Sequence, residues 1–502
     1  MKFILGIDQG TTSTTVILID EKLRIAGRHS AELPQHYPQA GWVEHNPEEI
    51  WETVCQAVRG ALNSAGVSGK EVEAIGITNQ RETTILWDKE TDKPLHNAIV
   101  WQCRRTAEIC EELKKKGLEE IFRKRTGLLL DPYFSGTKIM WLLRNSDVIR
   151  KKVAEGRVAF GTVDSFLLWK LTGGKVHATD PSNASRTLIF SIEDMKWDRE
   201  LCNIMEVPAQ ILPEVKPNFS TFGKTRGLDF LPDGIPISAM AGDQQAALYG
   251  QACFKRDEAK CTYGTGAFLL INTGSELVRS RNGLVSSVGW QKRDGSVTYV
   301  LEGSSFTAGS AVQWLRDSLG IILKASEIEE LAKNADSRSG VLFVPALTGL
   351  GAPYWDPEAR GAIFGLTRKT GKSEIARGVL EGIALQVRDL CSAMEADTQR
   401  KIVSFKVDGG ACVNNLLMKI QADFLGIPII RPQIVETTSL GVAMMAGLEA
   451  GVFKSEEELL SSWKFDRVFE PQMSDEERNF IINRWNSGIK AVRSFAKKME
   501  SN

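Results

Sequence analysis

The sequence predicts an α/β protein of two domains built on mixed β-sheets. Its 502 residues exceed what one hydrophobic core usually serves, so two domains are expected. A long helical pattern lies among short β-branched and aliphatic runs, which are typical of strands, at 3–7, 14–19, 23–27, 72–78 and 83–87. Along the chain, a hairpin and a third strand come before the first helix, and the next strand follows it. Because this order is not a simple βα alternation, we expect a mixed sheet rather than a barrel.

The helical pattern between the third and fourth strands has signals for both of its ends. Asn46 is a good N-cap, Pro47 takes the first helical position, and Gly66 is a stop. The apolar positions follow helical spacing: Ile50, Val54, Ala57, Val58, Ala61 and Leu62. The sequence therefore predicts an amphipathic helix over 47–65.

Composition excludes several functional classes. The 62 basic and 63 acidic residues leave a net charge of −1, without the long basic run expected of a nucleic-acid binder. The eight cysteines form no CxxC pair and the five histidines do not cluster, which argues against structural zinc. The strand pattern begins by Phe3, leaving no room for a secretory leader, and no apolar run approaches 18 residues. We therefore expect a cytoplasmic protein without a membrane span.

The first candidate binding element is DQGTT, residues 8–12, between the first two strands. We expect Gly10 to take a positive φ in this hairpin turn, so that neighbouring backbone N–H groups point into one space. Thr11, Thr12 and Ser13 add hydroxyl donors beside them. Such a turn suits a phosphate; the alternative is an ordinary polar hairpin tip.

A similar turn occurs in the second half, in KCTYGTGAFLLINTG, residues 260–274. It again places Gly-Thr before an apolar strand, as though a second domain began with its own phosphate hairpin. Two such domains facing each other would bind a nucleotide between them. The alternative is that the two glycine-rich turns are similar by coincidence. We place the boundary near residue 250, with domains over 1–250 and 251–502.

One stretch, GLTRKTGKS at 365–373, ends like a phosphate-binding P-loop. However, five residues separate Gly365 from Gly371, where the P-loop motif has four. We interpret its end as the exposed start of a helix over 373–394.

Eight strings stand out along the chain, in the order DQGTT, ITNQRETTILW, AIVWQCRRT, DPYFSGTK, GDQQAALYGQ, YGTGAF, GLGAPYWDPEARGAIFGLTR and VDGGACVNN. With these strings in this order, the sequence resembles the FGGY carbohydrate kinase family, in particular members that phosphorylate glycerol. The resemblance covers residues 1 to about 495. It implies an actin-like (ribonuclease H-like) two-domain ATPase fold with ATP and Mg²⁺ in a central nucleotide cleft.

The resemblance also implies which residues bind glycerol. A small neutral triol offers only hydroxyls, so its site needs donors and acceptors at fixed places. The polar candidates are Arg81, Glu82, Tyr133, Asp243 and Gln244, and Trp101 and Phe268 match the apolar wall against the carbon backbone. Without the surrounding motif, Arg81 and Glu82 would instead read as an exposed ion pair at a strand end.

Asp243 is the candidate general base, because an ionised carboxylate can accept the proton of the attacking hydroxyl. By resemblance, Asp8 acts on Mg²⁺, and Asp243 is the second candidate metal residue. The resemblance assigns the nucleotide to residues of both halves: Thr11, Thr12, Ser13, Thr265, Gly309, Gln313, Gly410 and Asn414.

The chain departs from the family pattern in places. Position 15 is Thr15, where the family's phosphate hairpin often has an arginine, and no histidine lies beyond His177 to be phosphorylated as in some relatives. TRGLDFLPDG, 225–234, does not obviously reproduce a sugar-bisphosphate loop. The family expectation is a homodimer or homotetramer. The alternatives are a family kinase for another polyol or sugar and, more remotely, an actin-like ATPase without a small-molecule acceptor.

Overall fold

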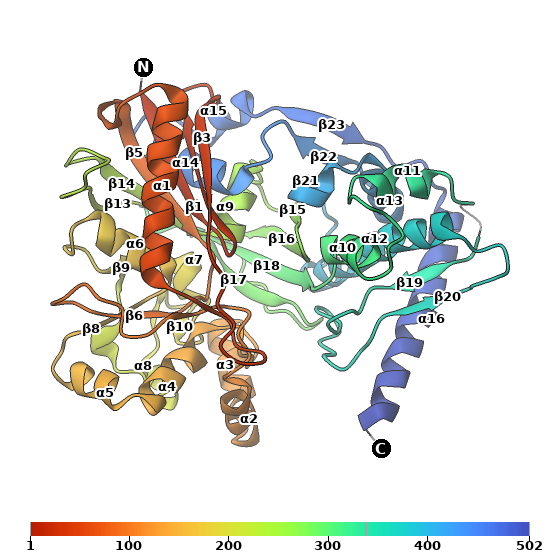
Figure 1. The fold of residues 1–502 in the computed structure, drawn as a ribbon, viewed down its shortest axis with the longest axis horizontal. Coiled ribbons are helices and arrows are strands. Elements are labelled where there is room, and N and C mark those ends of the chain that lie inside the picture. The colour runs from red at the N-terminus through yellow and green to blue at the C-terminus, as the bar shows by residue number, and fades with distance from the viewer. Residues whose placement is uncertain (1, 337–338, 501–502) are drawn as a thin grey trace.

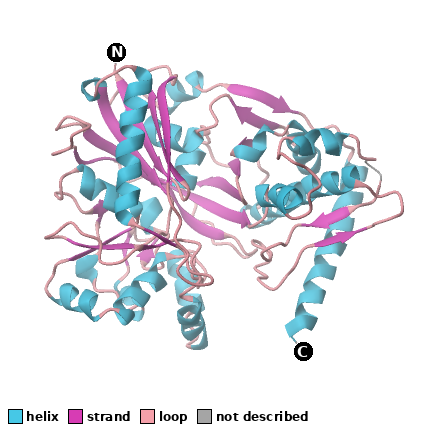
Figure 2. Ribbon diagram, viewed as in Figure 1, coloured by secondary structure: helices cyan, strands magenta, loops and turns pink. Residues whose placement is uncertain are grey.

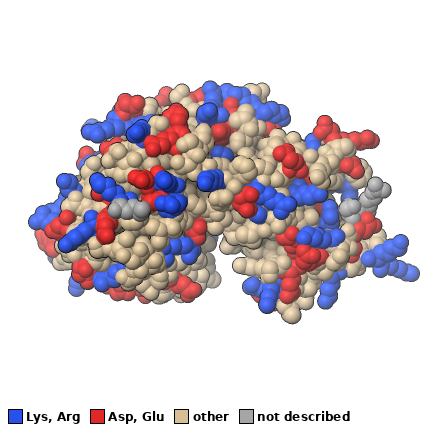
Figure 3. All heavy atoms as spheres, turned by 90° about the horizontal axis from the view of Figure 1, so that it is seen from above, with Lys and Arg blue, Asp and Glu red and all other residues tan. Residues whose placement is uncertain are grey.

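A computed structural model describes residues 2–336 and 339–500. The chain forms two mixed β-sheets with helices packed on their faces, as the α/β prediction expected (Figures 1 and 2). The N-terminus lies beside the first sheet, and the C-terminal helix lies at the opposite end of the molecule (Figure 1). In the space-filling view, basic and acidic side chains are interspersed, and the outline is notched where the two lobes meet (Figure 3).

The first sheet combines an antiparallel meander with parallel strands. β1, β2 and β3 form the meander, while β5 and β14 run parallel to β1 and β13 closes the edge antiparallel to β14. The strands, in spatial order, are β13 (Phe219–Lys224), β14 (Pro236–Gly242), β5 (Val72–Asn79), β1 (Phe3–Gln9), β2 (Ser13–Ile19) and β3 (Ile25–Glu32). The expected runs at 3–7, 14–19 and 72–78 thus form strands of this sheet, the run at 23–27 enters β3 only from Ile25, and the run at 83–87 enters β6 (Ile85–Asp88), which lies outside this sheet.

The second sheet repeats this pattern. β15, β16 and β18 lie side by side and antiparallel, with β17 antiparallel at the outer edge of β18, while β21 is parallel to β15 and β22 is parallel to β21. In spatial order the strands are β17 (Val285–Gln291), β18 (Val297–Ser305), β16 (Ala267–Gly274), β15 (Glu258–Tyr263), β21 (Ser404–Asp408), β22 (Ile429–Pro432) and β23 (Phe465–Phe469). Each sheet therefore begins with a hairpin that carries one of the two similar glycine-rich turns.

The first sheet is buried on both faces. Phe3, Leu5 and Ile7 share a core with α1 (Pro47–Ala65) and α6 (Val163–Leu171), whereas Ile4 points to the opposite core, formed with α14 (Thr437–Glu449). This alternation is the two-residue period of a β-strand. The predicted ends of α1 are confirmed: Asn46 accepts a hydrogen bond from the backbone of Glu48, and Gly66 is left-handed at φ 66°.

The helix pair α9 (Asp243–Gly250) and α14 lies between the two sheets. Their core also contains Leu270 of β16 and Val300 of β18. A Cβ atom on Gly441 would lie 1.8 Å from the carbonyl oxygen of Ala246, and one on Gly250 would lie 1.9 Å from that of Thr437. Only glycine permits these backbones to approach so closely.

Shorter elements complete the first half. Its remaining helices are α2 (Ala107–Lys115), α3 (Glu119–Thr126), α4 (Ser135–Asn145), α5 (Asp147–Ala154), α7 (Pro181–Ala184) and α8 (Arg199–Ile204). Four two-stranded pairs lie among them: β4 (Glu44–His45) with β7 (Ala98–Ile99), β6 (Ile85–Asp88) with β8 (Val158–Gly161), β9 (Ala178–Thr179) with β12 (Glu214–Val215), and β10 (Phe190–Ser191) with β11 (Lys196–Trp197).

The long helix α12 (Lys372–Thr398) shares the core of the second sheet. The other elements of this half are α10 (Gly309–Asp317), α11 (Glu327–Lys333), α13 (Asn415–Leu425), α15 (Glu456–Ser462), α16 (Asp475–Glu500), β19 (Leu342–Val344) and β20 (Ala362–Phe364). The stretch 365–373, whose end resembles a P-loop, runs into the exposed start of α12, as expected. There the carboxylate of Glu374 accepts a hydrogen bond from the backbone of Gly371 at 2.8 Å.

Candidate functional site

Three neighbouring parallel strands end at one edge of the first sheet, and the predicted acceptor-binding residues follow them. In the strand register, Asp8 of β1 pairs with Thr78 of β5, and Gly242, the last residue of β14, pairs with Asn79. Arg81 and Glu82 come just after β5, and Asp243 begins α9 directly after β14. The carboxyl edge of a parallel sheet is where α/β proteins commonly bind ligands.

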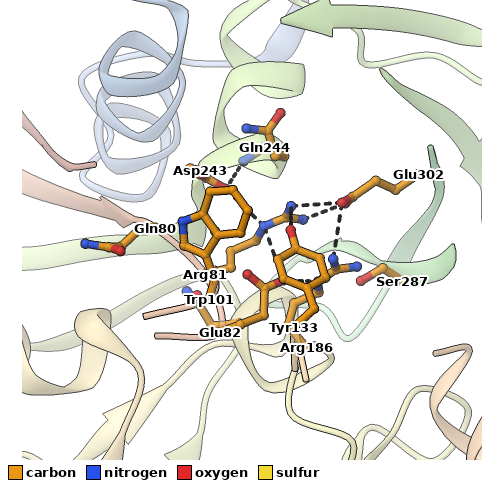
Figure 4. Close-up of polar contacts among 12 residues, drawn as sticks. Gln80, Arg81, Glu82, Trp101, Tyr133, Arg186, Asp243, Gln244, Ser287 and Glu302 are labelled. Atoms are coloured by element: carbon orange, nitrogen blue, oxygen red, sulfur yellow. Dashed lines mark hydrogen bonds and ion pairs between the residues drawn. The ribbon is translucent and has the colours of Figure 1, made fainter. Parts of the chain in front are cut away.

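Arg81 is at the centre of a buried cluster of charges (Figure 4). Its Nε lies 3.0 Å from Oδ1 of Asp243. Its two terminal nitrogens donate to the carboxylate of Glu302 in a fork, Nη1 to Oε2 at 2.6 Å and Nη2 to Oε1 at 2.9 Å. Nη1 also donates to Gln245 Oε1 at 3.2 Å, and Nη2 lies 3.5 Å from the hydroxyl of Tyr133. The guanidinium is thus held in one orientation.

Glu82 lies beside Arg81 but pairs mainly with another arginine. Arg186 Nε donates to Glu82 Oε1 at 2.5 Å, whereas Arg81 Nε is 3.9 Å from the same oxygen. The side chains of Arg81 and Glu82 are each only 2% exposed, and Glu82 has a positive φ of 61°. The alternative of an exposed ion pair at a strand end is therefore wrong.

Burial and the neighbouring arginines act in opposite directions on the pKa values of the two buried carboxylates, Glu82 and Glu302. Burial raises the pKa of Glu82, while Arg186 and Arg81 act in the opposite direction. Burial also acts to raise the pKa of Glu302, but the two guanidinium groups outweigh it and lower that pKa to about 2. Glu302 is therefore an ionised carboxylate shared by the two arginines.

The predicted apolar wall is assembled from three separate segments. The ring of Trp101 lies edge-on to Tyr133 at 5.6 Å and to Phe268 of β16 at 6.3 Å. Its indole Nε1 donates to Thr11 Oγ1 at 2.9 Å, which links the wall to the first glycine-rich turn. Buried Lys138 donates to the backbone carbonyl oxygen of Tyr133 and to those of its two neighbours.

Asp243 and Gln244 join the cluster to the second sheet. The carboxylate of Asp243 is 27% exposed and accepts a hydrogen bond from the backbone of Gln244 at 2.7 Å. Gln244 Oε1 accepts from Lys260 Nζ, and Lys260 also donates to Thr262 at 2.8 Å. Lys260 lies on β15, so residues of both halves meet at the start of α9.

Asp8 lies near Asp243 and is half-buried. Burial, together with the negative charge of Asp243, raises the pKa of Asp8 to about 8. Two carboxylates that repel each other match the donor set of a hard divalent cation such as Mg²⁺, which keeps several of its own waters and binds through one or two carboxylates. The described residues contain no group of three or more His, Cys, Asp or Glu side chains placed to hold a metal ion.

The first glycine-rich turn differs from our expectation. Gly10 does not have a positive φ, and its N–H is not free, because it donates to the carbonyl oxygen of Ser13 at 2.9 Å and closes the turn. Thr12 is exposed, and Thr11 and Ser13 are half-buried. The hydroxyls rather than the Gly10 amide are thus the groups that this turn can offer. Thr15 pairs with Asp8 across the hairpin and shares a 2.7 Å hydrogen bond with Ser30.

The second glycine-rich turn lies against the start of α10. Gly309 donates from its backbone to the carbonyl oxygen of Gly264 at 2.9 Å, and Ser310 donates to that of Thr265 at 3.1 Å. A Cβ on Gly309 would lie 2.6 Å from the Gly264 oxygen, which explains the glycine. Thr265 and Gln313 are both exposed. The structure therefore brings Thr265 and Gly309 together, with Gln313 one turn further along the helix.

Gly410 and Asn414 lie at the two ends of a short 3₁₀ turn. Gly409, just before it, has φ 85° and packs so closely on Tyr263 that a Cβ would lie 2.6 Å from that carbonyl oxygen. Gly410 itself has open space where a Cβ would be. Asn414 accepts a hydrogen bond from the backbone of Leu417 at 2.9 Å and thereby caps α13. Gly410 thus follows directly on a segment packed against the second turn.

Sequence reasoning missed the residues that connect the predicted ones. These are Arg186, Gln245, Lys260 and Glu302, all buried and all bonded to a predicted site residue. One signal was available: Glu302 interrupts the apolar strand pattern VTYVLEG, and a carboxylate in such a strand needs a buried partner. Nothing in the sequence identified Arg186 as that partner.

The fold and this site define a sugar or polyol kinase, and the chain belongs to the FGGY family of carbohydrate kinases. Residues 3–250 match the model of that family's N-terminal domain and residues 259–450 match that of its C-terminal domain. The fold is accordingly the two-domain, actin-like α/β fold of this family. No helix in the described ranges is both long and apolar enough to cross a membrane.

Individual relatives are similar along almost the whole chain. Glycerol kinase 2 of Thermotoga maritima is 52% identical over 99% of this chain and 100% of its own length. Glycerol kinase of Desulforamulus reducens is 52% identical over 97% of both chains. The crystal structure of Plasmodium falciparum glycerol kinase with ADP matches with a TM-score of 0.92 at 38% identity, covering 98% of each chain. Gluconate kinase from Lactobacillus acidophilus, at 21% identity, shares the fold with a TM-score of 0.86 over 99% of each chain.

Proposed function

We propose that this protein transfers the γ-phosphoryl group of ATP to a primary hydroxyl of glycerol, giving sn-glycerol 3-phosphate and ADP. The observation that carries the proposal is the cluster of Arg81, Glu82 and Asp243 beside the aromatic rings of Trp101 and Tyr133. Charged donors and acceptors fixed next to an apolar wall suit a small molecule with hydroxyls on one side and carbons on the other. The relatives of about half-identical sequence bear the name glycerol kinase.

The proposed roles follow from the placement of these groups. Arg81, Glu82, Tyr133 and Gln244 orient glycerol, and Trp101 and Phe268 limit the width of the site. As the acceptor oxygen bonds to the γ-phosphorus, the bond from that phosphorus to the bridging oxygen of ADP breaks, and Asp243 takes the hydroxyl proton. General-base assistance of this kind is worth roughly 10²- to 10⁴-fold in rate.

The nucleotide is assigned to residues of both halves. The hydroxyls of Thr11, Thr12, Ser13 and Thr265 would bind the phosphates, and Gly309, Gln313, Gly410 and Asn414 would bind the rest of the nucleotide. Asp8 and Asp243 would hold Mg²⁺, which neutralises negative charge on the phosphates of ATP. The open space at Gly410 and the repulsion between the two carboxylates support these assignments.

The remaining assignments extend the proposal. We assign residues 1–250 to the acceptor domain and 251–502 to the nucleotide domain, which is supported by the gap between β14, which ends at Gly242, and β15, which begins at Glu258. We also propose a cytoplasmic homodimer or homotetramer. Light scattering of the purified protein measures that assembly.

The function is tested by measuring ADP release with and without glycerol, and with xylulose or gluconate as competing acceptors. We expect ADP release to require glycerol. Preference for another polyol or sugar would show that the protein is a kinase of this family with a different acceptor. ADP release at the same rate with and without any acceptor would contradict the proposal and indicate an actin-like ATPase.

The mechanism is tested by Asp243→Asn, which removes the charge that accepts the proton. We expect kcat to fall by roughly 10²-fold or more. Glycerol binding should weaken by about 1.5–3 kcal/mol, the value of a hydrogen bond to a charged group, with ATP binding nearly intact. For comparison, Arg81→Ala should raise the KM for glycerol at least as much as it lowers kcat. If Asp243→Asn keeps a near wild-type kcat, Asp243 is not the general base. Asp8 and Glu82 are then the next carboxylates to test for that role.

A further inference from the structure

Glu302 belongs to the second sheet but contacts residues of the first half. It lies on β18, and its carboxylate reaches Arg81, which follows β5, and Arg186, which follows α7 (Figure 4). The residue is buried, so water does not stabilise its charge. Its ionised state therefore depends on these two arginines.

The contact with Arg81 has the geometry that best orients a guanidinium. Two parallel N–H···O bonds, at 2.6 and 2.9 Å, join the two terminal nitrogens of Arg81 to the two oxygens of Glu302. Such a fork fixes the plane of the guanidinium as well as its position. The third nitrogen, Nε, lies 3.0 Å from Oδ1 of Asp243 as an ion pair but makes no hydrogen bond.

Glu302 also separates two positive charges. Arg186 Nη2 donates to Glu302 Oε1 at 3.2 Å, the same oxygen that accepts from Arg81 Nη2. Arg186 in turn holds Glu82 through Nε, so the order of charges is Glu82, Arg186, Glu302, Arg81 and Asp243, negative and positive in alternation. Without Glu302, the two arginines would repel each other. The nearest remaining anions for Arg81 would be Asp243 and Glu82, at 3.0 and 3.9 Å.

We propose that Glu302 is a positioning residue of the glycerol site, holding Arg81 in place and, through Arg186, orienting Glu82. It keeps Arg81 from collapsing onto the carboxylates that must face the substrate. Because Glu302 comes from the opposite sheet, it also makes the acceptor site dependent on the half that holds the second glycine-rich turn. The inference rests on the proposed function, since it names what sets the geometry of that same site.

The test is Glu302→Gln, which preserves the shape of the side chain but removes its charge and one acceptor oxygen. We expect the KM for glycerol to rise by at least ~10-fold, with a smaller fall in kcat, while the KM for ATP stays within about twofold. A merely structural role would instead raise the KM values for glycerol and for ATP alike.

A matched control is Glu381→Gln on α12. Glu381 is also a carboxylate paired with an arginine, Arg377 at 2.8 Å, but it lies outside the cluster. Its substitution should leave the KM for glycerol unchanged. Glu302→Asp keeps the charge but withdraws the carboxylate by one methylene, and we expect a KM for glycerol between those of the wild type and Glu302→Gln.

The outcomes separate this inference from the proposed function. If the wild-type protein shows no glycerol-dependent ADP release, the proposed function fails before any variant is made. If the wild type is active and Glu302→Gln has an unchanged KM for glycerol, the function stands and the positioning role is overturned. Should Glu302→Gln not fold, an unchanged KM for glycerol in Glu302→Asp would overturn it equally.

Discussion

At the scale of single residues, the site depends on buried charges that compensate one another. Glu82 and Glu302 alternate with Arg81 and Arg186, and each carboxylate is bonded to at least one guanidinium. Removing one member of such a set leaves its partners buried without compensation, which costs more than the pair itself contributes. We therefore expect the stability of the protein to depend on the ionisation of these residues.

The stability contribution of Glu302 should vanish in acid. Its pKa is lowered to about 2 in the fold by Arg186 and Arg81, against burial, compared with the usual 4.5. A lowered carboxyl pKa stabilises the fold above the unfolded value, and this stability is lost as the pH falls from about 4.5 towards 2. The difference in unfolding free energy between wild type and Glu302→Gln should therefore shrink between pH 5 and pH 3, measured by urea unfolding.

Glu381→Gln provides a control of opposite sign. Burial raises the pKa of Glu381, with Arg377 acting against it, so ionisation of this residue destabilises the fold as the pH rises through 4.5 and above. The unfolding free energy of the wild type minus that of Glu381→Gln should thus increase as the pH falls, because protonation removes the buried charge from the wild type only. If both differences change in the same direction, the assigned electrostatics of the buried cluster are wrong.

At the scale of elements, the helices α9 and α14 are central. Asp243 begins α9, and α14 packs on α9 where Gly441 and Gly250 lie, so the proposed catalytic carboxylate is carried by a helix whose backbone touches its neighbour. α14 also packs on β1, β5 and β14, the strands that lead into the site. Any change in the spacing of this helix pair should move Asp243 relative to the first sheet.

Gly441→Ala should therefore destabilise the protein. A Cβ at this position would lie 1.8 Å from the backbone oxygen of Ala246, which cannot move aside as a flexible side chain could. Overpacking of this kind costs about 1–3 kcal/mol or more, which exceeds the helix propensity gained by alanine, ~1 kcal/mol. We expect a lower midpoint in urea and a lower kcat.

The matched substitution for that test is Gly378→Ala in α12. There the nearest atom to a new Cβ is a side-chain methyl of Val341 at 3.2 Å, which needs to shift only slightly. Its unfolding midpoint should stay close to that of the wild type. A Gly441→Ala protein that is equally stable would show that the contact between the helices relaxes easily.

At the scale of the whole molecule, the two sheets share one strand pattern and face a common site. Lys260 of the second sheet bonds Gln244, and Phe268 and Glu302 reach residues of the first half. The proposed nucleotide residues are likewise divided between the halves. Ligands that contact both halves favour the arrangement in which those contacts are shortest.

We therefore predict that glycerol together with a non-hydrolysable ATP analogue compacts the protein more than either ligand alone, as expected of hinge closure. Small-angle X-ray scattering of the free protein and its three ligand states measures the radius of gyration. Identical scattering profiles in all four states would contradict this prediction.

Local features were predictable because they depend on residues a few positions apart. The cap at Asn46, the stop at Gly66 and the strand over 3–7 depend on residues within one turn or one strand, and the structure has them as expected. The family resemblance supplied Arg81, Glu82 and Asp243 as site residues, and the fold places all three at one sheet edge. The positive φ expected of Gly10 was wrong, because a short turn can be closed in several ways and its own hydrogen bond to Ser13 decides among them.

The sequence by itself determined the α/β fold class, the helix α1, the strands β1, β2, β3 and β5 of the first sheet, and the identity of the motif residues. Only the tertiary structure decided that Arg81 is bonded to Glu302, 221 residues away, and Glu82 to Arg186, 104 residues away. Such pairs leave no periodic signal in the chain, since they depend on how two sheets and the helices between them pack. The same packing removes water from the cluster, and burial is what makes each of these charges require its partner.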